Sequence, residues 1–352
     1  MMEQIRRNFA SDNVSPACPE IMEALVAASS GSVPSYGGDP WTEHLRIKIR
    51  TVFENDHAEI FPVTTGTASN AIALSTLCPP WGVIFCDESA HILNDECGAP
   101  EFLTGGAKLQ PLSSPDGRIL PETLQQTLGK RDFSRPHDNV PSALSITQAT
   151  EWGTVYSIEH IRELTDQARS SGLGVHMDGA RFSNALVTLG CSPAEATWKS
   201  GVDILSLGAT KNGAMAAEVM VVFDPTRAAN MGQRLKRSGH VWSKQRYISA
   251  QLLAWFDNDL WLRNAGQANA MATRLASGLA RIPGVILPWA TESNEVFVVL
   301  PDLLAQHLEA EGFGFYRWDT PSGLEGVLIR LVCGYDTRTE DVDALLESAS
   351  TI

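Results

Sequence analysis

Apolar and polar positions in the middle of the chain follow two alternating patterns. Short apolar runs rich in β-branched residues, each about the length of a strand, stand at 143–147, 174–177, 202–207 and 219–223. Between the first two runs, apolar residues recur at helical spacing from Ile158 to Ala168, after a capping Ser157 and before Gly172. A second helix is predicted over 180–189. Strands that alternate with helices imply right-handed crossovers and a mostly parallel central sheet flanked by helices, which is the α/β class.

The last third of the chain has a different pattern. Residues 244–281 predict one long helix with an interruption near 264–266. Strand-like runs follow at 285–287, 296–300, 315–318 and 327–332, with helical runs at 303–311 and 340–348. We therefore predict two domains, a large one over residues 1–250 and a smaller α+β carboxyl-terminal one over 251–352.

Composition narrows the class of protein. The chain has 352 residues and a formal net charge of −14, which argues against a nucleic-acid partner. No apolar run approaches the roughly 20 residues that a membrane helix needs, and no secretory leader follows the first residues. Six scattered cysteines without a Cys-x-x-Cys pair are typical of reduced thiols. We expect a cytoplasmic globular protein without a membrane partner.

Polar residues follow three neighbouring strands of the predicted sheet. In such sheets ligands bind at the carboxyl ends of the strands, so these residues are candidates for a binding site. They are Gln148, Thr150 and Glu151 after the first strand, Asp178 and Arg181 after the second, and Thr210, Lys211 and Asn212 after the third. Helix caps and loop polarity explain some of them, but they do not explain a lysine within Gly208-Ala209-Thr210-Lys211-Asn212-Gly213-Ala214.

A glycine turn opens a helix at Thr65-Gly66-Thr67-Ala68-Ser69. Backbone N–H groups at a helix start form an anion site, although a glycine beside a capping threonine is also common in helices that bind nothing. The chain has neither a Walker A loop nor Gly-x-Gly-x-x-Gly, which disfavours a nucleotide or a nicotinamide cofactor.

Asp178 and Lys211 add chemistry to this anion site. A carboxylate at a strand end next to Gly179 can hold a pyridinium N–H, although Asp178 and Arg181 also fit an ordinary helix-start ion pair. Lys211 among small residues can form a Schiff base with an aldehyde, whereas a lone lysine is usually a surface residue. The order of phosphate turn, aspartate and lysine indicates pyridoxal phosphate (PLP).

His91 and Arg330 are two further candidates, and each also has an ordinary structural explanation. His91 follows the apolar run 83–86 and could stack on a flat ring and act as a base, or be an ordinary loop histidine. Arg330 lies within an apolar strand, where either a substrate carboxylate or a buried acidic partner would justify its charge. No histidines stand at metal-ligand spacing, so we predict no metal site.

Taken together, these residues resemble the threonine aldolase and β-eliminating lyase family of fold-type I PLP-dependent enzymes, particularly the low-specificity L-threonine aldolases, from about Phe9 to Asp343. The stretches that carry the resemblance are Ser11-Asp12-Asn13, Tyr36-Gly37-Gly38-Asp39-Pro40, Thr65-Gly66-Thr67-Ala68-Ser69-Asn70, Ala90-His91, Glu96-Cys97-Gly98, His176-Met177-Asp178-Gly179-Ala180-Arg181, Thr210-Lys211-Asn212-Gly213 and Ile329-Arg330-Leu331-Val332.

The resemblance implies a role for each matching residue. Lys211 would hold the cofactor covalently, Asp178 its pyridine nitrogen, Arg181 its ring oxygen, and Gly66 and Thr67 its phosphate. His91 would stack on the ring near the substrate hydroxyl, and the substrate carboxylate would go to Ser11 and Arg330. A neighbouring subunit would contribute Tyr36, Lys236 and Lys244 within a homotetramer of two tight dimers.

One stretch departs from the family pattern. Many members have Thr-His-Asn-Gly where this chain has Thr150-Glu151-Trp152-Gly153, so Glu151 replaces a histidine associated with the substrate hydroxyl. Asp95, four residues after His91, could also act near the substrate side chain. The resemblance implies cleavage of L-threonine, L-allo-threonine or phenylserine to glycine and an aldehyde. β-Elimination, racemisation or transamination on the same scaffold, or a non-catalytic binding role, remain as alternatives.

Overall fold

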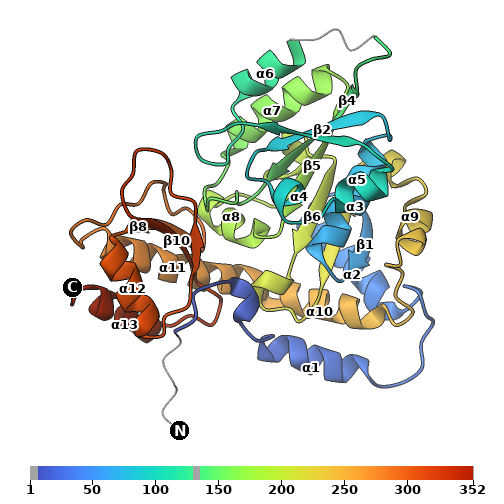
Figure 1. Ribbon diagram of the computed structural model, residues 1–352. Coiled ribbons are helices and arrows are strands. Elements are labelled where there is room, and N and C mark those ends of the chain that lie inside the picture. The colour runs from blue at the N-terminus through green and yellow to red at the C-terminus, as the bar shows by residue number, and fades with distance from the viewer. Residues whose placement is uncertain (1–6, 130–134, 352) are drawn as a thin grey trace.

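The computed structural model describes residues 7–129 and 135–351, so the first residues, where a leader was sought, lie outside the described part. A seven-stranded sheet forms the centre, with strand order β1-β7-β6-β5-β4-β2-β3 (Figure 1). Its strands are β1 (Glu59–Val63), β2 (Gly82–Asp87), β3 (Lys108–Leu112), β4 (Val140–Thr147), β5 (Gly174–Gly179), β6 (Ile204–Gly208) and β7 (Glu218–Val222). The four strands predicted between residues 143 and 223 are confirmed, with ends shifted by a few residues.

The sheet is mostly parallel, as predicted. Strands β2 to β6 pair in parallel, whereas β7 runs antiparallel to both β6 and β1. Thr147 of β4 pairs with Asp178 of β5, which in turn pairs with Ser206 of β6. The carboxyl ends of these three strands are therefore level, and the polar residues after them share one rim.

Both faces of the sheet are buried, which explains the continuous apolar runs of its strands. Val221 and Leu205 belong to one hydrophobic core, while their neighbours Val222 and Ile204 belong to another on the opposite face. The helices of this part of the chain are α1 (Pro19–Ala28), α2 (Pro40–Val52), α3 (Gly66–Leu77), α4 (His91–Asn94), α5 (Ala99–Thr104), α6 (Pro121–Gly129), α7 (Ile158–Ser170), α8 (Phe182–Leu189), α9 (Met231–Arg237) and α10 (Arg246–Phe256). Of these, α2, α3, α7, α8 and α10 pack on strands of the sheet, whereas α1 packs mainly on α10. Ser157 caps α7 by accepting from the His160 N–H, as predicted.

A smaller antiparallel sheet stands beside the large one (Figure 1). Its strand order is β8-β10-β9, and its strands are β8 (Glu295–Leu300), β9 (Tyr316–Trp318) and β10 (Val327–Val332). The helices α11 (Leu260–Leu279), α12 (Asp302–Ala310) and α13 (Thr339–Ala349) build a separate core with it. Phe9 is buried in that same core, so the start of the described chain packs on the second sheet. Within the described ranges no helix is long and apolar enough to span a bilayer.

Two predictions for the last third of the chain were wrong. The long helix breaks at Asp257–Asp259, not at 264–266, because Asn258 and Asp259 adopt left-handed backbone conformations with φ of 50° and 54°. The run 285–287 forms no strand and makes only one isolated bridge, from Ile286 to Val299. The proposed domain boundary at residue 250 falls inside α10, and the division into domains stays a prediction.

Candidate active site

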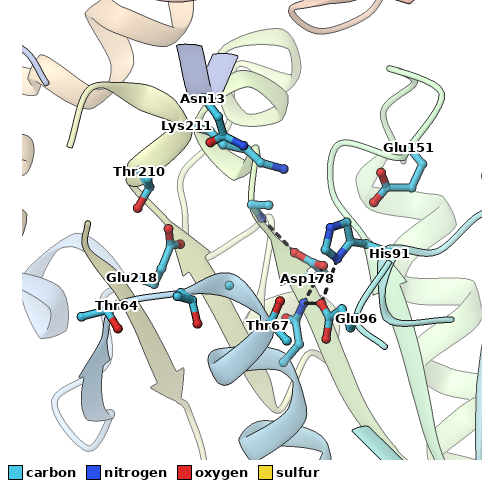
Figure 2. A pocket seen from close by; sticks show the side chains of 14 residues that line it. Asn13, Thr64, Thr67, His91, Glu96, Glu151, Asp178, Thr210, Lys211 and Glu218 are labelled. Atoms are coloured by element: carbon cyan, nitrogen blue, oxygen red, sulfur yellow. Dashed lines mark hydrogen bonds and ion pairs between the residues drawn. The ribbon is translucent and has the colours of Figure 1, made fainter. Parts of the chain in front are cut away.

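A pocket of about 280 Å³ opens at the rim where β4, β5 and β6 end (Figure 2). Because β7 is antiparallel to β6, its first residue reaches the same rim. The residues lining the pocket come from the start of α3, the segment around α4 and the ends of the central strands. They are Asn13, Thr64, Thr65, Gly66, Thr67, Asn70, His91, Glu96, Glu151, Asp178, Ala180, Thr210, Lys211 and Glu218.

The amino-terminal end of α3 points into this pocket. Thr65 caps the helix, because its hydroxyl accepts from the Ala68 N–H at 3.2 Å. The first N–H groups of a helix have no partner within the helix, so those of Gly66 and Thr67 are available to a ligand. A side chain at Gly66 would meet nothing within 4 Å, which shows that the space beside this turn is open. The turn fits an anion.

Asp178 belongs to a chain of hydrogen-bonded side chains on one wall of the pocket. Its Oδ1 accepts from the Ala180 N–H at 3.0 Å, and its Oδ2 accepts from Asn70 Nδ2 at 2.8 Å. Asn70 Nδ2 also donates to Glu96 Oε1 at 2.9 Å, and the same oxygen contacts His91 Nδ1 at 2.9 Å. Four side chains from three segments are thereby held in one arrangement before any ligand binds.

His91 has a raised pKa because of this chain. The hydrogen bond to Glu96 is the main cause, and it outweighs the opposing effect of burial, while the negative charges of Glu151 and Asp178 add to it. Since Glu96 occupies Nδ1, the free nitrogen of the ring is Nε2. The hydrogen bond to Glu96 therefore holds the ring of His91 in one orientation.

Lys211 lies on the opposite wall, in the short 3₁₀ helix Thr210–Asn212 that follows β6. Across residues 7–129 and 135–351, its ammonium group makes no hydrogen bond or ion pair, although its charge lowers the pKa of Asp12. Glu218 stands nearby and is only 6% exposed. Burial raises the pKa of Glu218 to about 7, opposed in part by hydrogen bonding from Thr210 and by the charge of Lys211.

Arg181 lies outside the pocket lining and is bound to buried acids. Its Nε and Nη2 donate to the two oxygens of Asp12 at 2.8 and 3.1 Å, and Nη2 stands 3.3 Å from Glu295 Oε1. Burial alone would raise the pKa of Asp12, but the charges of Arg181 and Lys211 hold it below its usual value. The helix-start ion pair considered for Asp178 and Arg181 is instead formed with Asp12.

Arg330 of β10 is held more loosely than Arg181. Its Nη1 is 3.5 Å from Glu295 Oε1, and its Nη2 donates to the Ala10 carbonyl at 3.3 Å. Its Nε is buried and has no hydrogen-bond partner within the described residues. The guanidinium also lies over the rings of Tyr316 and Trp318, at 5.6 and 5.4 Å. Glu295 is therefore the buried acidic partner of Arg330, and the Nε–H of Arg330 remains available to a ligand.

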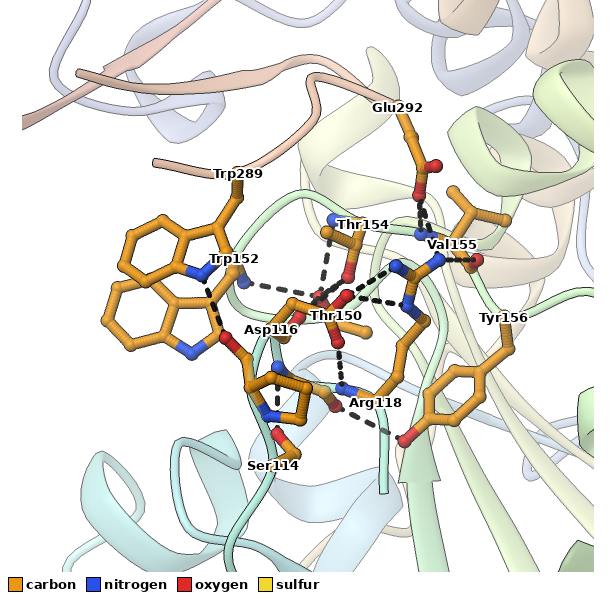
Figure 3. A network of polar contacts seen from close by, with 12 residues as sticks. Ser114, Asp116, Arg118, Thr150, Trp152, Thr154, Val155, Tyr156, Trp289 and Glu292 are labelled. Carbon is orange, nitrogen blue, oxygen red and sulfur yellow. Dashed lines mark hydrogen bonds and ion pairs between the residues drawn. The ribbon is translucent and has the colours of Figure 1, made fainter. Parts of the chain in front are cut away.

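Glu151 is carried by a loop that is fixed to the second sheet (Figure 3). Trp152 stacks on Trp289 with ring centroids 4.3 Å apart and also contacts Phe297 and Trp318. Behind it, the Val155 N–H donates to Glu292 Oε2 at 2.7 Å. Burial raises the pKa of Glu151, with Lys211 opposing this effect and Glu295 adding to it.

The same loop is tied to the segment that leads into α6. The Thr154 hydroxyl donates to the Asp116 carbonyl at 2.8 Å and shares a 2.7 Å hydrogen bond with the Thr150 hydroxyl. Gly153 has φ of 75°, and a Cβ there would lie 2.9 Å from the Glu295 carbonyl oxygen. Glu151 therefore stands on a rigid support, whose polar network through Thr150, Thr154 and Arg118 is shown in Figure 3.

The structure brings together six of the residues to which the resemblance assigned a role, namely Gly66, Thr67, His91, Glu151, Asp178 and Lys211, together with the strand-end candidate Thr210. The others lie outside the pocket lining. Ser11 caps a short 3₁₀ helix by accepting from the Asn13 N–H, and Asp95 is exposed after α4. Tyr36 and Lys236 line a second pocket of about 380 Å³, where Lys236 Nζ lies 5.4 Å from the Tyr36 ring, and Lys244 is exposed.

Asn70, Glu96 and Glu218 are among the lining residues that had no assigned role from the sequence. Asn70 lies within α3, where an asparagine inside a helix gives no functional signal. Glu96 stood in a matching stretch, yet only its contact with His91 reveals its role. Glu218 begins an apolar strand, and the antiparallel direction of β7, which brings it to the rim, was not predicted from the sequence.

Comparisons with known proteins agree with this geometry. A model of the β-eliminating lyase family matches residues 8–302. The chain belongs to this family. It is 39% identical to the low specificity L-threonine aldolase of a Pseudomonas species over 340 residues, covering 96% of each chain. It is also 24% identical to the alanine racemase TOXG of Cochliobolus carbonum, covering 97% of this chain and 86% of that one.

Among solved structures, a threonine aldolase of Leishmania major matches this lyase-family fold with a TM-score of 0.91. The identity is 24%, and the match covers 98% of both chains. The α/β fold with a mostly parallel sheet is therefore confirmed at the level of whole-chain architecture.

Proposed function

We propose that this protein is a PLP-dependent carbon–carbon lyase. It cleaves L-threonine, L-allo-threonine and related L-β-hydroxy-α-amino acids, such as phenylserine, to glycine and an aldehyde. The observation that carries the proposal is the convergence of Lys211, Asp178 and the open start of α3 on one pocket. The 39% identity to a low specificity L-threonine aldolase supports the choice of reaction.

The polar groups of the pocket fit this cofactor. The free N–H groups of Gly66 and Thr67 suit a phosphate, and the carboxylate of Asp178 suits a pyridine N–H. Lys211 supplies an amine without a competing ion pair for an aldehyde carbon. When bound, PLP would supply an electron sink for the pair released by the broken Cα–Cβ bond. Arg181 would donate to the ring oxygen through N–H groups that its acidic partners leave free.

The remaining residues act on the substrate. Nε2 of His91 takes the proton of the β-hydroxyl, because Nδ1 is held by Glu96. Glu151 faces the same space, and its raised pKa allows it to hold a proton there. This residue takes the place of the family's second histidine and stands on the rigid loop of Figure 3.

Arg330 and Ser11 bind the substrate carboxylate in this proposal. The unpaired Nε of Arg330 and its long contact with Glu295 leave donors for a second carboxylate. Fixing the carboxylate orients the Cα–Cβ bond, and orientation alone lowers the barrier by several kcal/mol, in the range of about 7–11 for ideal cases. Asp95 is proposed to act near the side chain of the substrate.

We place Tyr36, Lys236 and Lys244 at a neighbouring subunit's phosphate, in a cytoplasmic homotetramer built from two dimers. Tyr36 is 57% exposed, and both lysines are exposed on a single chain, as residues reserved for a partner would be. Sedimentation of the purified protein tests the assembly. A monomer that is active at high dilution would contradict it.

The reaction is tested by measuring aldehyde release from L-threonine, L-allo-threonine, L-phenylserine and their D-forms, with PLP supplied. We expect aldehyde from the L-forms alone. Racemisation is the second candidate, favoured by the similarity to an alanine racemase. D-alanine formed from L-alanine, or pyruvate released from serine, without aldehyde from any β-hydroxy amino acid, would replace the aldolase with racemisation or β-elimination.

A further inference from the structure

Glu218 is a buried acid that none of the proposed steps uses. It begins β7, where it pairs with Val63 of β1 on one side and with Gly208 of β6 on the other. Val63 immediately precedes the turn at the start of α3, and Gly208 precedes the loop that carries Lys211. Glu218 therefore lies between the two segments that would hold the phosphate and the aldehyde of the cofactor.

The surrounding structure makes room for this carboxyl group and fixes it. A Cβ at Gly208 would lie 2.8 Å from both the Cα and the carbonyl oxygen of Ala180 and 2.9 Å from Glu218 Oε2, so the Ala180 backbone requires glycine at this position beside the acid. The turn before β7 is held by Gln251 Oε1 of α10, which accepts from the N–H groups of Met215 and Ala216 at 3.0 and 3.1 Å. Figure 2 shows Glu218 between Thr64 and Thr210, on the side of the pocket away from His91.

Few charges face Glu218. Lys211 is the cation that acts on it from the loop after β6, and Asp178 is the anion that acts on it from β5. The residues beside it in the pocket lining, Thr64 after β1 and Thr210 before Lys211, are neutral. Burial and the hydrogen bond from Thr210 are fixed by the fold, so the ionisation of Glu218 changes with the charge of Lys211 and with any anion that enters the pocket.

We propose that Glu218 is a positioning residue that carries a proton whenever the cofactor is bound, so that loading of PLP takes up a proton near neutral pH. This inference rests on the proposed function. A phosphate at the start of α3 brings negative charge into the same small pocket, which disfavours an ionised carboxylate. Covalent use of the Lys211 amine also weakens the cation that favours that carboxylate. Both effects favour the protonated form of Glu218.

The pH window follows from the ionisation of the empty site. Burial raises the pKa of Glu218 to about 7 without the cofactor, and the phosphate raises it further. Below that window Glu218 is protonated in both states, so its proton does not influence affinity. Above pH 7 the empty protein must gain the proton on binding, and affinity falls by up to about tenfold per pH unit.

The test compares cofactor affinity between pH 6 and 8.5 in the full-length protein and in Glu218→Gln. The probes are PLP and pyridoxine 5′-phosphate, which lacks the aldehyde and cannot bond to Lys211. We expect the affinity of the unaltered protein for both probes to weaken steeply above pH 7, and that of Glu218→Gln to weaken much less. Glu163→Gln on the exposed face of α7, away from both pockets, is the control and should behave like the unaltered protein.

Calorimetry of PLP binding to the unaltered protein at pH 8, in two buffers of different ionisation enthalpy, measures the proton uptake without any variant. Uptake of a proton with both probes supports the proposal. Equal pH dependence in Glu218→Gln and the unaltered protein, or no uptake at pH 8, would overturn it while leaving the aldolase intact. Absence of PLP binding at every pH would instead overturn the proposed function, and this inference with it.

Discussion

The two walls of the pocket differ in how their polar groups are held. On the wall of Asp178, hydrogen bonds of 2.8–2.9 Å link Asp178, Asn70, Glu96 and His91 into one chain. On the wall of Lys211, the amine makes no hydrogen bond or ion pair with any residue of the described ranges, and Glu218 has a pKa of about 7. Asp178 and Lys211, at the centre of the two walls, stand at the ends of the neighbouring strands β5 and β6.

The difference matches what each wall has to do. Groups that orient a flat ring work best when they are fixed beforehand, since no reorganisation is then needed during the reaction. The amine that forms a bond to the cofactor must instead be free of strong partners. The first wall therefore governs orientation, whereas the second governs cofactor loading.

The largest effect is expected from Lys211→Ala. This change removes the amine that would bind the cofactor, and we expect the rate of aldehyde release to fall by on the order of 10⁴-fold or more. Lys108→Ala, an exposed lysine on β3, is the control and should keep full activity. If Lys211→Ala retained turnover, Lys211 could not be the residue that binds the cofactor.

Arg330→Ala tests a cation that stands outside both walls. Loss of the carboxylate clamp should lower kcat/KM by about 10²-fold or more, mainly through KM, because a charge-paired hydrogen bond of this kind is worth about 2–5 kcal/mol. PLP affinity should stay unchanged. The control is Arg317→Ala on neighbouring β9, which pairs with Glu309 at the surface. Equal kinetics in both variants would contradict the clamp.

Trp152→Ala tests how strongly the aromatic cluster stabilises the loop that carries Glu151. Removing a ring that packs on three aromatic side chains should lower the free energy of unfolding by about 3 kcal/mol. Denaturant unfolding followed by circular dichroism measures it. Trp81→Ala, 65% exposed, should change this free energy by less than about 0.5 kcal/mol. Similar losses in the two variants would mean that the aromatic cluster fixes nothing.

The smallest effect is expected from Glu96→Gln, which loosens the first wall. It removes the main cause of the raised pKa of His91, so the acid limb of kcat/KM should move to lower pH. Because that pKa is raised on folding, the ion pair stabilises the fold below the ordinary histidine pKa. This contribution is lost as pH rises through the raised value. Glu88→Gln, which bonds Ser113 instead, is the control. An unmoved limb would exclude His91 as the base.

Sequence patterns pointed to the strand-end residues of this pocket because polar residues there interrupt or follow apolar runs. Lys211, Asp178 and Glu151 each stand just after or at the end of an apolar run, and the sheet made their positions adjacent. Asn70 and Glu218 escaped notice because an amide inside a helix and an acid at a strand start give no signal in one dimension. The break at Asn258 was misplaced since it depends on backbone conformation rather than on apolar spacing.

The central claim is that Lys211 is the residue to which PLP binds covalently. Borohydride reduction of the PLP-loaded protein, followed by proteolysis and peptide mass spectrometry, locates the attached group directly. The account predicts a single labelled peptide with the phosphopyridoxyl group on Lys211 and no such peptide after Lys211→Ala. A label on another lysine, or a protein that stays unlabelled and colourless with PLP, would contradict it.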